Sequence, residues 1–579
     1  MKNALILILS VTWMTGGCVQ NEKPKQAAVA PVAGNRFDVL ITNATIYDGS
    51  GTPPYPGEVA IDGDRIAFVG AKAPAAAGRT IDARGQAVAP GFINMLSHSR
   101  ETILQDGRAM NVVMQGVTLE VNSETSNAPL TEKMRQRRMT LQGDTRTPVP
   151  WTTIGGYLDH VEKSGVSVNV ASLVGAGIIR EYVIGLDDVD PSPVELARMR
   201  DLARAAMEEG ALGVATMLIY VPETFAEMPE LIALAAEAGK CGGIFAAHMR
   251  DEGAGILQSV DEMVAIGRAS GAPVHIHHLK QTGAANWGKL GAVIAQVEAA
   301  RRAGVPITAD MYLYIASGTG ATAMLPVWVQ EGGLEATIAR LKDPAVRARA
   351  VADMQKPGNM RDPATAMFSS FRNPALRQYS GKRVSEVARL RGTSPAETVI
   401  DLIVEDGSRV NTIYFAMSED NVRRQTALPW MTFGSDAGSH ATEGAFLESE
   451  VHPRTYGNFA RLLGKYVRED KALTLQEAVR KLTSSPASIL GIKDRGTLRA
   501  GAFADVVIFD PATIEDVSTF EDSHHYARGV SNVWVNGVQV LAEGRHTGAK
   551  PGRAVRGRGW RHDGEGGCRA SATDWPRAG

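Results

Sequence analysis

The sequence of 579 residues is poor in cysteine, in net charge and in long hydrophobic runs, and each shortage excludes a class of protein. Its three cysteines are too few for the disulfide framework that staples small secreted domains. Its 61 basic and 63 acidic residues leave a net charge of −2, which gives no electrostatic reason to expect a nucleic-acid partner. Hydrophobic residues make up 44% of the chain, so it can bury a large core and does not need disulfide bonds to fold.

The N-terminus has the pattern of an export signal. Lys2 precedes the apolar run Ala4–Leu9, and small residues follow as far as Cys18. This run is too short to span a bilayer as a helix, but its flanks are typical of a secretory signal. Because Thr15–Cys18 resembles a bacterial lipoprotein box, we predict that residues 1–18 are a lipoprotein signal peptide with Cys18 as the lipidated residue. The alternative is a plain signal peptide with an incidental cysteine.

The segments around the folded part carry further expectations. Residues 19–36 are rich in Ala, Pro and Lys and are predicted to be a flexible tether. The protein is expected to lie in the periplasm, and its lipid anchor is its only expected contact with the membrane. Cys241 and Cys568 are expected to be ordinary thiols. The tail, residues 556–579, is rich in Gly and Arg and is predicted to be disordered. No feature of the sequence indicates an oligomeric state.

Short strands are predicted at both ends of the folded part. In residues 37–90, the turn Asp62–Asp64 joins two apolar-polar runs, and near the other end an Asn-Gly turn at residues 536–537 joins two more. Two such segments can form one domain if the middle of the chain is a closed unit with adjacent ends. Residues 37–90 and 486–555 are therefore predicted to form one small β-sandwich.

The middle of the chain alternates apolar runs with helical patterns, which predicts an α/β fold with parallel strands and crossover helices. Residues 193–209, for example, have apolar positions at helical spacing. Eight such runs indicate a (β/α)8 TIM barrel over residues 91–485, with an insertion within about 317–427. The runs are Phe92–Leu96, Val117–Val121, Val168–Val174, Leu212–Ala215, Ile244–His248, Val274–His278, Ile307–Tyr312 and Trp430–Ser435.

Three of these runs end in residues that can form a metal site. Active residues of such barrels lie at the carboxyl ends of strands, where this chain has His248, His278 and Asp436. Imidazole suits zinc, and a nearby carboxylate can accept a proton from water. A lone histidine after a strand is more often a hydrogen-bonded structural residue, and His275 and His277 are interpreted in that way because strand alternation turns them away from His278.

From about Phe37 to Arg556 the chain resembles the D-aminoacylase branch of the amidohydrolase superfamily, whose members remove acyl groups from N-acyl-D-amino acids. Each motif that carries the resemblance is weak alone, but their order and spacing are specific. The motifs are Ala89–Asn94, Gln115–Thr118, Ala247–Glu252, His278–Lys280, Ala309–Tyr314, Gly434–Asp436, His452–Arg454 and Asp494–Gly496.

The resemblance implies a role for each matching residue. It implies His248 and His278 as zinc ligands and Asp436 as the general base. It also implies a set of residues that hold the carboxylate of the substrate, namely Lys280, Tyr312 and Arg454. Two cations and a phenol can bind a carboxylate while the metal polarises the amide carbonyl nearby. The alternative for Lys280 and Arg454 is salt bridging at the surface.

The chain departs from the family pattern at two positions. Where the family has His-x-His after the first strand, this chain has Leu96 and His98, so a second metal position is expected to be weak or empty. His98 is then either a vestigial ligand or a hydrogen-bond donor to the oxyanion. The family's cysteine ligand after the second strand is also absent, and Glu124 is the nearest side chain that could replace it. Glu124 is either the third zinc ligand or a loop residue beside the ligands.

These expectations describe a hydrolase with about one zinc per chain that acts on small N-acyl-D-amino acids. Two rival hypotheses remain open. The first is a hydrolase of cyclic amides or dipeptides on the same scaffold, because a fold does not fix the substrate. The second is a degenerate, non-catalytic lipoprotein that binds a ligand, which the loss of a histidine at Leu96 would favour.

Overall fold

The computed structural model describes residues 36–142, 147–562 and 565–568. The predicted signal peptide with Cys18 lies outside these residues, as does the predicted tether except Arg36, which begins the first strand. Within the described residues, no helix has both the length and the apolar character needed to cross a membrane.

Parallel strands follow the eight predicted runs, with the third run divided in two. They are β6 (Phe92–Ser97), β7 (Val117–Asn122), β8 (Asn169–Ser172), β9 (Val174–Gly175), β10 (Gly213–Met217), β11 (Ile244–His248), β12 (Val274–Ile276), β13 (Ile307–Met311) and β17 (Met431–Phe433). One sheet has the order β6-β7-β8 and another the order β9-β10-β11-β12-β13-β17. A parallel bridge between Ser97 and Ala437 links the first strand to the segment after the last. Because neighbouring parallel strands run in one direction, their carboxyl ends lie along one edge.

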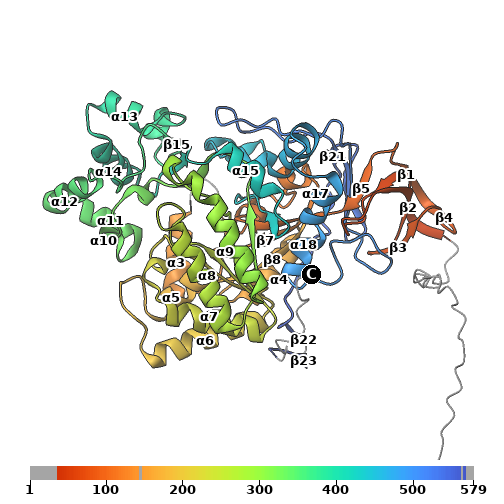
Figure 1. The fold of residues 1–579 in the computed structure, drawn as a ribbon, viewed down its shortest axis with the longest axis horizontal. Helices are drawn as coiled ribbons and strands as arrows, with labels where there is room; N and C mark the ends of the chain where they lie inside the picture. Colours follow the sequence, from red (N-terminus) through yellow and green to blue (C-terminus); the bar gives the residue numbers. More distant parts are fainter. Residues whose placement is uncertain (1–35, 143–146, 563–564, 569–579) are drawn as a thin grey trace, which may run out of the picture. The chain divides into compact units, whose positions relative to one another are not determined.

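The helices between these strands confirm the predicted α/β alternation. Helix α6 (Pro193–Glu208) begins at the cap Ser192, whose side chain accepts a hydrogen bond from the backbone of Glu195 in a reciprocal capping box. Figure 1 shows α5 to α9 side by side along one flank of the molecule. The other helices of this part are α1 (Thr102–Gln105), α2 (Met110–Val113), α3 (Glu132–Leu141), α4 (Ile154–Ser164), α5 (Ala176–Val183), α7 (Met228–Lys240), α8 (Ile256–Ser270) and α9 (Leu290–Arg302).

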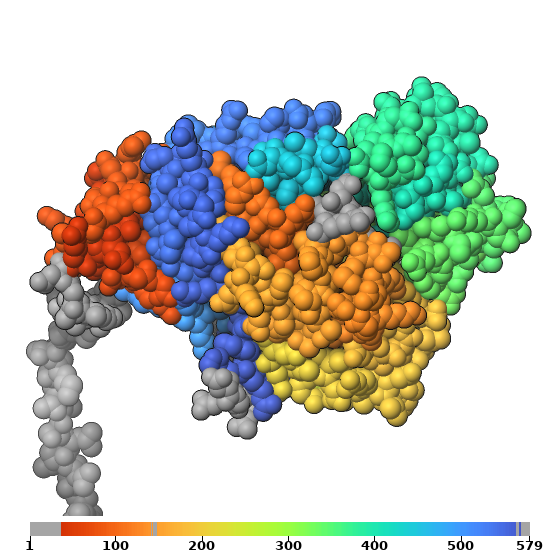
Figure 2. All heavy atoms as spheres, turned by 180° about the vertical axis from the view of Figure 1, so that it is seen from behind, coloured from red at the N-terminus to blue at the C-terminus, as the bar shows by residue number. Residues whose placement is uncertain are grey.

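Both ends of the chain contribute to one nine-stranded sheet. Its strands are β1 (Arg36–Ile46), β2 (Tyr55–Asp62), β3 (Arg65–Gly70), β4 (Ala76–Asp82), β5 (Ala87–Pro90), β18 (Val506–Phe509), β19 (Val530–Val535), β20 (Val538–Ala542) and β21 (Arg545–His546). The two ends meet where β5 pairs antiparallel with β18, and Figure 2 shows the red N-terminal strands directly beside blue C-terminal segments. Asn536 and Gly537, with φ of 47° and 79°, form the predicted hairpin turn.

The predicted insertion contains a three-stranded sheet and several helices. The sheet has the order β14 (Ser317–Gly320), β16 (Asn411–Tyr414), β15 (Ala366–Ser370), and the helices are α10 (Val327–Gln330), α11 (Gly333–Leu341), α12 (Pro344–Met354), α13 (Val384–Arg391) and α14 (Pro395–Asp406). Buried residues such as Phe368, Val399 and Leu402 give this segment an apolar core of its own. After it come α15 (Glu419–Thr426), α16 (Arg454–Arg461), α17 (Leu475–Leu482) and α18 (Ser484–Ile489).

The expectation of a disordered tail was wrong for the part of residues 556–579 that the structure describes. The Arg556 guanidinium donates to the carbonyl oxygen of Glu209 at 2.7 Å, and β22 (Arg561–His562) pairs with β23 (Glu565–Gly566). Glu209 lies far from Arg556 in the sequence, so the Gly- and Arg-rich composition of the tail gave no sign of that contact. The described tail is therefore ordered by a tertiary contact together with a short local pairing.

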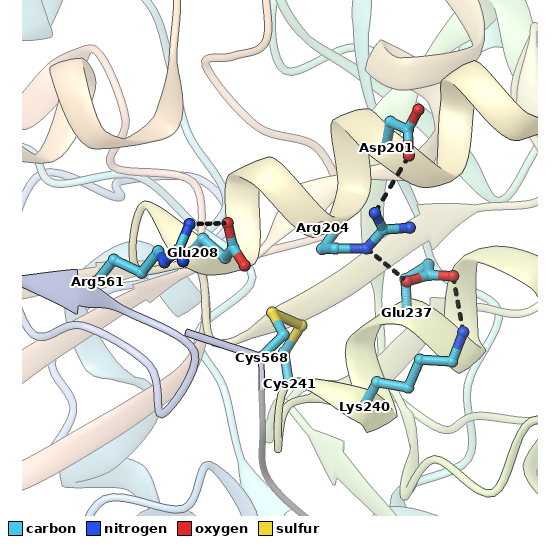
Figure 3. The surroundings of a disulfide bond; sticks show 8 residues. All are labelled: Asp201, Arg204, Glu208, Glu237, Lys240, Cys241, Arg561 and Cys568. Atoms are coloured by element: carbon cyan, nitrogen blue, oxygen red, sulfur yellow. Dashed lines mark hydrogen bonds and ion pairs between the residues drawn. A yellow bond between two sulfur atoms is a disulfide. The ribbon is translucent and has the colours of Figure 1, made fainter. Parts of the chain in front are cut away.

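Cys241 and Cys568 form a disulfide, so the expectation of two ordinary thiols was wrong. Cys241 directly follows α7, and Cys568 lies 327 residues later, in the described tail. Figure 3 shows the bond near the ion pair between Arg561 and Glu208, where the tail lies against α6. A separation of this size hides the pairing from any argument based on cysteine spacing.

Removal of this disulfide is expected to lower the stability of the fold. Cys568→Ser should cost about 2 to 5 kcal/mol, because the bond closes a long loop and so restricts the unfolded chain. Calorimetry should show a melting temperature several degrees below that of the wild type, and wild-type protein in reductant should match the variant. Equal melting temperatures for oxidised wild type and Cys568→Ser would show that the bond does not form in solution.

Candidate active site

Five candidate site residues lie together at the carboxyl ends of parallel strands. His98 follows β6, Glu124 follows β7, His248 ends β11, His278 follows β12 and Asp436 follows β17. Glu124, His278 and Asp436 have left-handed backbone conformations, with φ of 65°, 34° and 50°. Such conformations are costly for residues other than glycine and cluster at functional sites, where the surrounding structure holds them. The strands therefore direct these side chains to one place.

Glu124, His248 and His278 form the arrangement best suited to a metal ion. The Oε1 atom of Glu124 lies 3.1 Å from Nδ1 of His248 and 2.7 Å from Nε2 of His278. All three ligand atoms lie within 4.8 Å of one another, and the three residues are buried. Burial alone would raise the pKa of Glu124, but hydrogen bonds from the two histidines hold its pKa well below the usual range. The donor set of one carboxylate and two imidazoles matches zinc.

A carboxylate that the sequence analysis missed orients one of these histidines. Glu252 Oε1 lies 3.0 Å from His278 Nδ1 and 2.5 Å from Lys280 Nζ. Histidine ligands commonly donate their second ring N–H to a carboxylate, which fixes the tautomer and orientation of the ring. The only sequence signal for Glu252 is its place four residues after His248, within a motif of the family. Lys280 Nζ also donates to the carbonyl oxygen of His278 at 3.1 Å and lies 2.7 Å from Nδ1 of the same histidine.

Asp436 lies between His98 and Arg454. Its Oδ1 atom is 2.7 Å from Nε2 of His98, and its Oδ2 atom is 2.8 Å from Nη1 of Arg454. Burial favours the neutral acid, but the charge of Arg454 and the hydrogen bond with His98 lower the pKa of Asp436 below its usual value. The carboxyl group is therefore ionised at neutral pH and able to accept a proton.

His98 belongs to a second group of possible metal ligands, with Glu124 and Asp436, whose ligand atoms also lie within 4.8 Å of one another. The Nε2 atom of His98 is 3.2 Å from Oε2 of Glu124, so Glu124 connects the two groups. Leu96 is fully buried, and its side chain occupies the space beside Gly434. This second group therefore lacks the additional histidine that the family pattern has at that position.

Polar atoms of Tyr312, Arg454 and His248 in the site lack a hydrogen-bond partner among the described residues. The hydroxyl of Tyr312 and the Nε atom of Arg454 are both buried without a hydrogen bond. The guanidinium of Arg454 lies 4.5 Å from the centre of the Tyr312 ring, so the two groups are neighbours. Buried polar atoms are rarely left without a partner, and this pair can be satisfied by an anionic ligand.

His275 and His277 have structural roles, as the interpretation of the sequence expected. Both rings bond to Oδ2 of Asp310, and their other nitrogens contact hydroxyl groups, those of Thr308 and Ser123. His275, His277 and Asp310 are close enough together to hold a metal ion, but all four ring nitrogens have hydrogen-bond partners within the protein and neither histidine lines the cavity. Oδ1 of Asp310 also accepts a hydrogen bond from the backbone N–H of His278 at 2.8 Å, so the cluster helps to position His278.

The site opens into a cavity of about 240 Å³. His98, Glu124, His248, His278 and Asp436 line it, together with the carboxylate-binding candidates Lys280, Tyr312 and Arg454. The structure thus brings together every site residue that the sequence analysis named among the described residues. The insertion supplies another wall, formed by residues 317–320, Arg361, Arg409 and Asn411. The cavity therefore has space for a small molecule beside the three possible metal ligands.

Comparisons with known proteins identify the family. Residues 79–541 match the amidohydrolase family. The chain belongs to this family. It is 34% identical over 521 residues to a D-aminoacylase of Alcaligenes xylosoxydans xylosoxydans, an alignment that covers 90% of this chain and 97% of that protein. An N-acyl-D-glutamate deacylase of the same organism is 32% identical over 524 residues, with the same two coverages.

Solved structures agree with this assignment. The chain is similar to a crystal structure of an N-acyl-D-glutamate deacylase from Bordetella bronchiseptica, with a TM-score of 0.74 and 29% identity. The match covers 90% of this chain and 100% of that one. That crystal structure holds zinc and a phosphonate inhibitor that mimics the tetrahedral intermediate of the reaction. The resemblance to the D-aminoacylase branch is thereby confirmed.

Proposed function

We propose that this protein is a zinc-dependent deacylase that hydrolyses the amide bond of N-acyl-D-amino acids. The observation that carries the proposal is the convergence of Glu124, His248 and His278 beside an ionised Asp436. A degenerate binding protein has no physical need for such an arrangement, in which a general base adjoins a complete set of possible metal ligands. The similarity to D-aminoacylases over nearly the whole chain supports the same reaction.

The three possible ligands fit zinc by their chemistry and by their contacts. In the structure, Nε2 of His278 lies 2.7 Å from Oε1 of Glu124, and metal binding would replace that hydrogen bond because zinc requires a deprotonated ring nitrogen. Zinc would supply Lewis-acid chemistry, polarising the acyl carbonyl and making water a better nucleophile. Asp436 then takes the proton from the attacking water and returns it to the nitrogen of the leaving amino acid. His98 donates to Asp436 and keeps its carboxylate in place.

Arg454 and Tyr312 are proposed to hold the α-carboxylate of the substrate. Both have a buried polar atom without a partner in the described chain, which a carboxylate would satisfy. Lys280 adds a second positive charge. It contacts Glu252 and His278 in the structure and would exchange one of these contacts for the substrate. With the α-carboxylate and the carbonyl both fixed, the side chain can point in only one direction for each enantiomer, which is the basis of selection for D-amino acids.

We further propose that the parallel strands form one closed (β/α)8 barrel over residues 91–485. The backbone N–H of Asp436 donates to the carbonyl oxygen of Leu96, and that of Leu212 donates to Ser172, so hydrogen bonds cross both junctions between the two parallel sheets. The nine-stranded sheet is proposed to fold over itself as the sandwich of residues 37–90 and 486–555. A hydrogen bond from Ile66 to Ala502 supports this, because it ties the β3 edge to the segment before β18.

The protein is also proposed to be an exported bacterial lipoprotein of the periplasm, anchored through Cys18 and the tether of residues 19–36. The disulfide between Cys241 and Cys568 supports export, because such bonds form and persist mainly in oxidising compartments. Metabolic labelling with a radioactive fatty acid tests the anchor. Label should enter the wild type and be absent from Cys18→Ser.

A panel of substrates tests the proposed reaction. Zinc-loaded protein should hydrolyse N-acetyl-D-amino acids and leave the L-enantiomers, dipeptides and hydantoins largely intact. The release of free amine, measured with and without added zinc, gives the rate for each compound. A preference for hydantoins or dipeptides would replace the deacylase by the corresponding hydrolase on the same scaffold, and no activity with one zinc bound would leave only a binding role.

A further inference from the structure

The insertion brings two arginines to the wall of the active-site cavity. Arg361 lies between α12 and β15, and Arg409 lies between α14 and β16, so both belong to the segment inserted before the last parallel strand. Both line the same cavity as His248 and Asp436. The insertion therefore supplies positive charge to a site whose metal ligands come from the parallel strands.

These two arginines differ from the other cations that line the cavity. Lysine and arginine side chains in its wall are Arg100, Lys280, Arg361, Arg409 and Arg454. Lys280 pairs with Glu252, Arg454 with Asp436, and Arg100 with Glu101 at 3.9 Å. Within the described residues, neither Arg361 nor Arg409 forms an ion pair with a carboxylate. The cavity thus has positive charge on its insertion side without protein carboxylates to balance it.

Aromatic rings and hydroxyls hold the two guanidinium groups without neutralising them. The guanidinium of Arg409 lies 4.5 Å from the centre of the Tyr220 ring, and its nitrogens donate to the hydroxyls of Thr319 and Thr322 at 3.4 Å. Arg361 lies 4.7 Å from the centre of the Tyr414 ring. Such contacts order a guanidinium but leave N–H groups available for a planar, bidentate anion.

Tyr220 connects this arginine pair to the metal ligands. Its ring packs edge-on against His248, with 5.6 Å between the ring centres, and its hydroxyl contacts Thr319 at 2.5 Å. The charges of Arg409 and Arg361 both act on Tyr220, where they oppose the rise of its pKa that burial causes. The Arg409 guanidinium and His248 both contact the Tyr220 ring and line the same cavity, so a substrate bound at His248 has Arg409 in the wall beside it.

We infer that Arg361 and Arg409 form a subsite for a second carboxylate of the substrate, in addition to the α-carboxylate. The inference rests on the proposed deacylase function and specifies its substrate class. The second carboxylate could belong to the amino-acid side chain, as in an N-acyl-D-glutamate, or to the acyl group, as in an N-succinyl amino acid. In both cases a guanidinium–carboxylate pair forms in the cavity, and neutral substrates cannot form that contact.

Two matched pairs of substrates test the inference and separate the two positions of the carboxylate. N-acetyl-D-glutamate is compared with N-acetyl-D-glutamine, and N-succinyl-D-leucine with N-butanoyl-D-leucine. The charged member of one pair should have a kcat/KM about 10- to 100-fold higher than its neutral partner, the range expected for a charged hydrogen bond. A preference in the first pair places the carboxylate on the side chain, and a preference in the second places it on the acyl group.

Single variants then connect the preference to the two residues. Arg361→Gln and Arg409→Gln should each remove most of the preference while leaving kcat/KM for the neutral substrates within about twofold. Arg349→Gln serves as a control, since this arginine lies over the Trp328 ring in the same insertion and does not line the cavity. The inference would be overturned if charged and neutral substrates had equal kcat/KM, or if the variants lowered kcat/KM equally for both. The protein would still be a deacylase in either case.

Binding measurements keep the test independent of turnover. Calorimetric titration of zinc-loaded Asp436→Asn with N-acetyl-D-glutamate, N-acetyl-D-glutamine, N-succinyl-D-leucine and N-butanoyl-D-leucine should show tighter binding of a charged compound. In the double variant Asp436→Asn, Arg409→Gln, the charged and neutral compounds should bind with equal affinity. If this pattern holds and the unmodified protein hydrolyses none of the four compounds, the subsite stands and the proposed reaction fails. Equal affinities within both pairs would overturn the subsite.

Discussion

Asp436→Asn is expected to lower kcat by about 10²- to 10⁴-fold, the usual contribution of a general base, while bound zinc stays at the wild-type level. The carboxylate of Asp436 is held ionised by Arg454 and His98, so it can accept a proton that an amide cannot. Glu124, His248 and His278 are unchanged in this variant, which is why zinc should remain. Steady-state kinetics and zinc analysis on the same preparation check both parts.

The division of the effect between kcat and KM distinguishes a base from a structural partner. If Asp436 served mainly to hold Arg454, its loss would disturb the carboxylate clamp, so KM would rise and kcat would fall only slightly. Asp401→Asn is a suitable control, because Asp401 forms an ion pair with Arg347 at 2.5 Å in the insertion, outside the cavity wall. Full activity in Asp436→Asn would show that another group accepts the proton.

The sequence was most informative where local pattern alone fixes the position of a side chain. His248, His278 and Asp436 each lie at the end of an apolar run that forms a parallel strand, and the carboxyl ends of such strands lie at one edge regardless of the loops. Glu124 was found through the resemblance to the family, as the side chain nearest to the missing cysteine ligand after β7. The alternation rule also separated His277 from its neighbour His278, because side chains on a strand alternate between two faces.

Features that depend on long-range contacts were not predictable from the sequence. Glu252 orients His278 across a turn, and its role depends on how that turn folds. Arg361 and Arg409 reach the cavity from separate loops of the insertion, so no spacing rule connects them with the strand ends. The disulfide joins Cys241 to the described tail over 327 residues, and the apolar periodicity that predicts strands carries no information about it.

Glu124→Gln is expected to weaken zinc binding by at least about 100-fold. Loss of a residue that only hydrogen-bonds to a metal ligand weakens binding by up to about 100-fold, and loss of a ligand should cost at least as much. Glutamine has nearly the same size, and it would occupy the same left-handed backbone position as Glu124, so the change removes mainly the negative charge. That charge lies 2.7 Å from His278 and 3.1 Å from His248, where it would balance a divalent cation. Competition with a chromogenic chelator measures the affinity.

His278→Ala and Glu120→Gln supply the two reference points for this measurement. His278→Ala removes a proposed ligand outright and sets the loss expected for one, whereas Glu120 is a buried carboxyl of β7 that bonds to Asn94 and Ser99. If Glu124→Gln loses as much affinity as His278→Ala, Glu124 is a ligand and the site has one carboxylate and two imidazoles. If its loss is close to that of Glu120→Gln, the carboxylate only neighbours the metal, and His98 becomes the candidate for the third ligand because its Nε2 lies 3.2 Å from the same carboxylate.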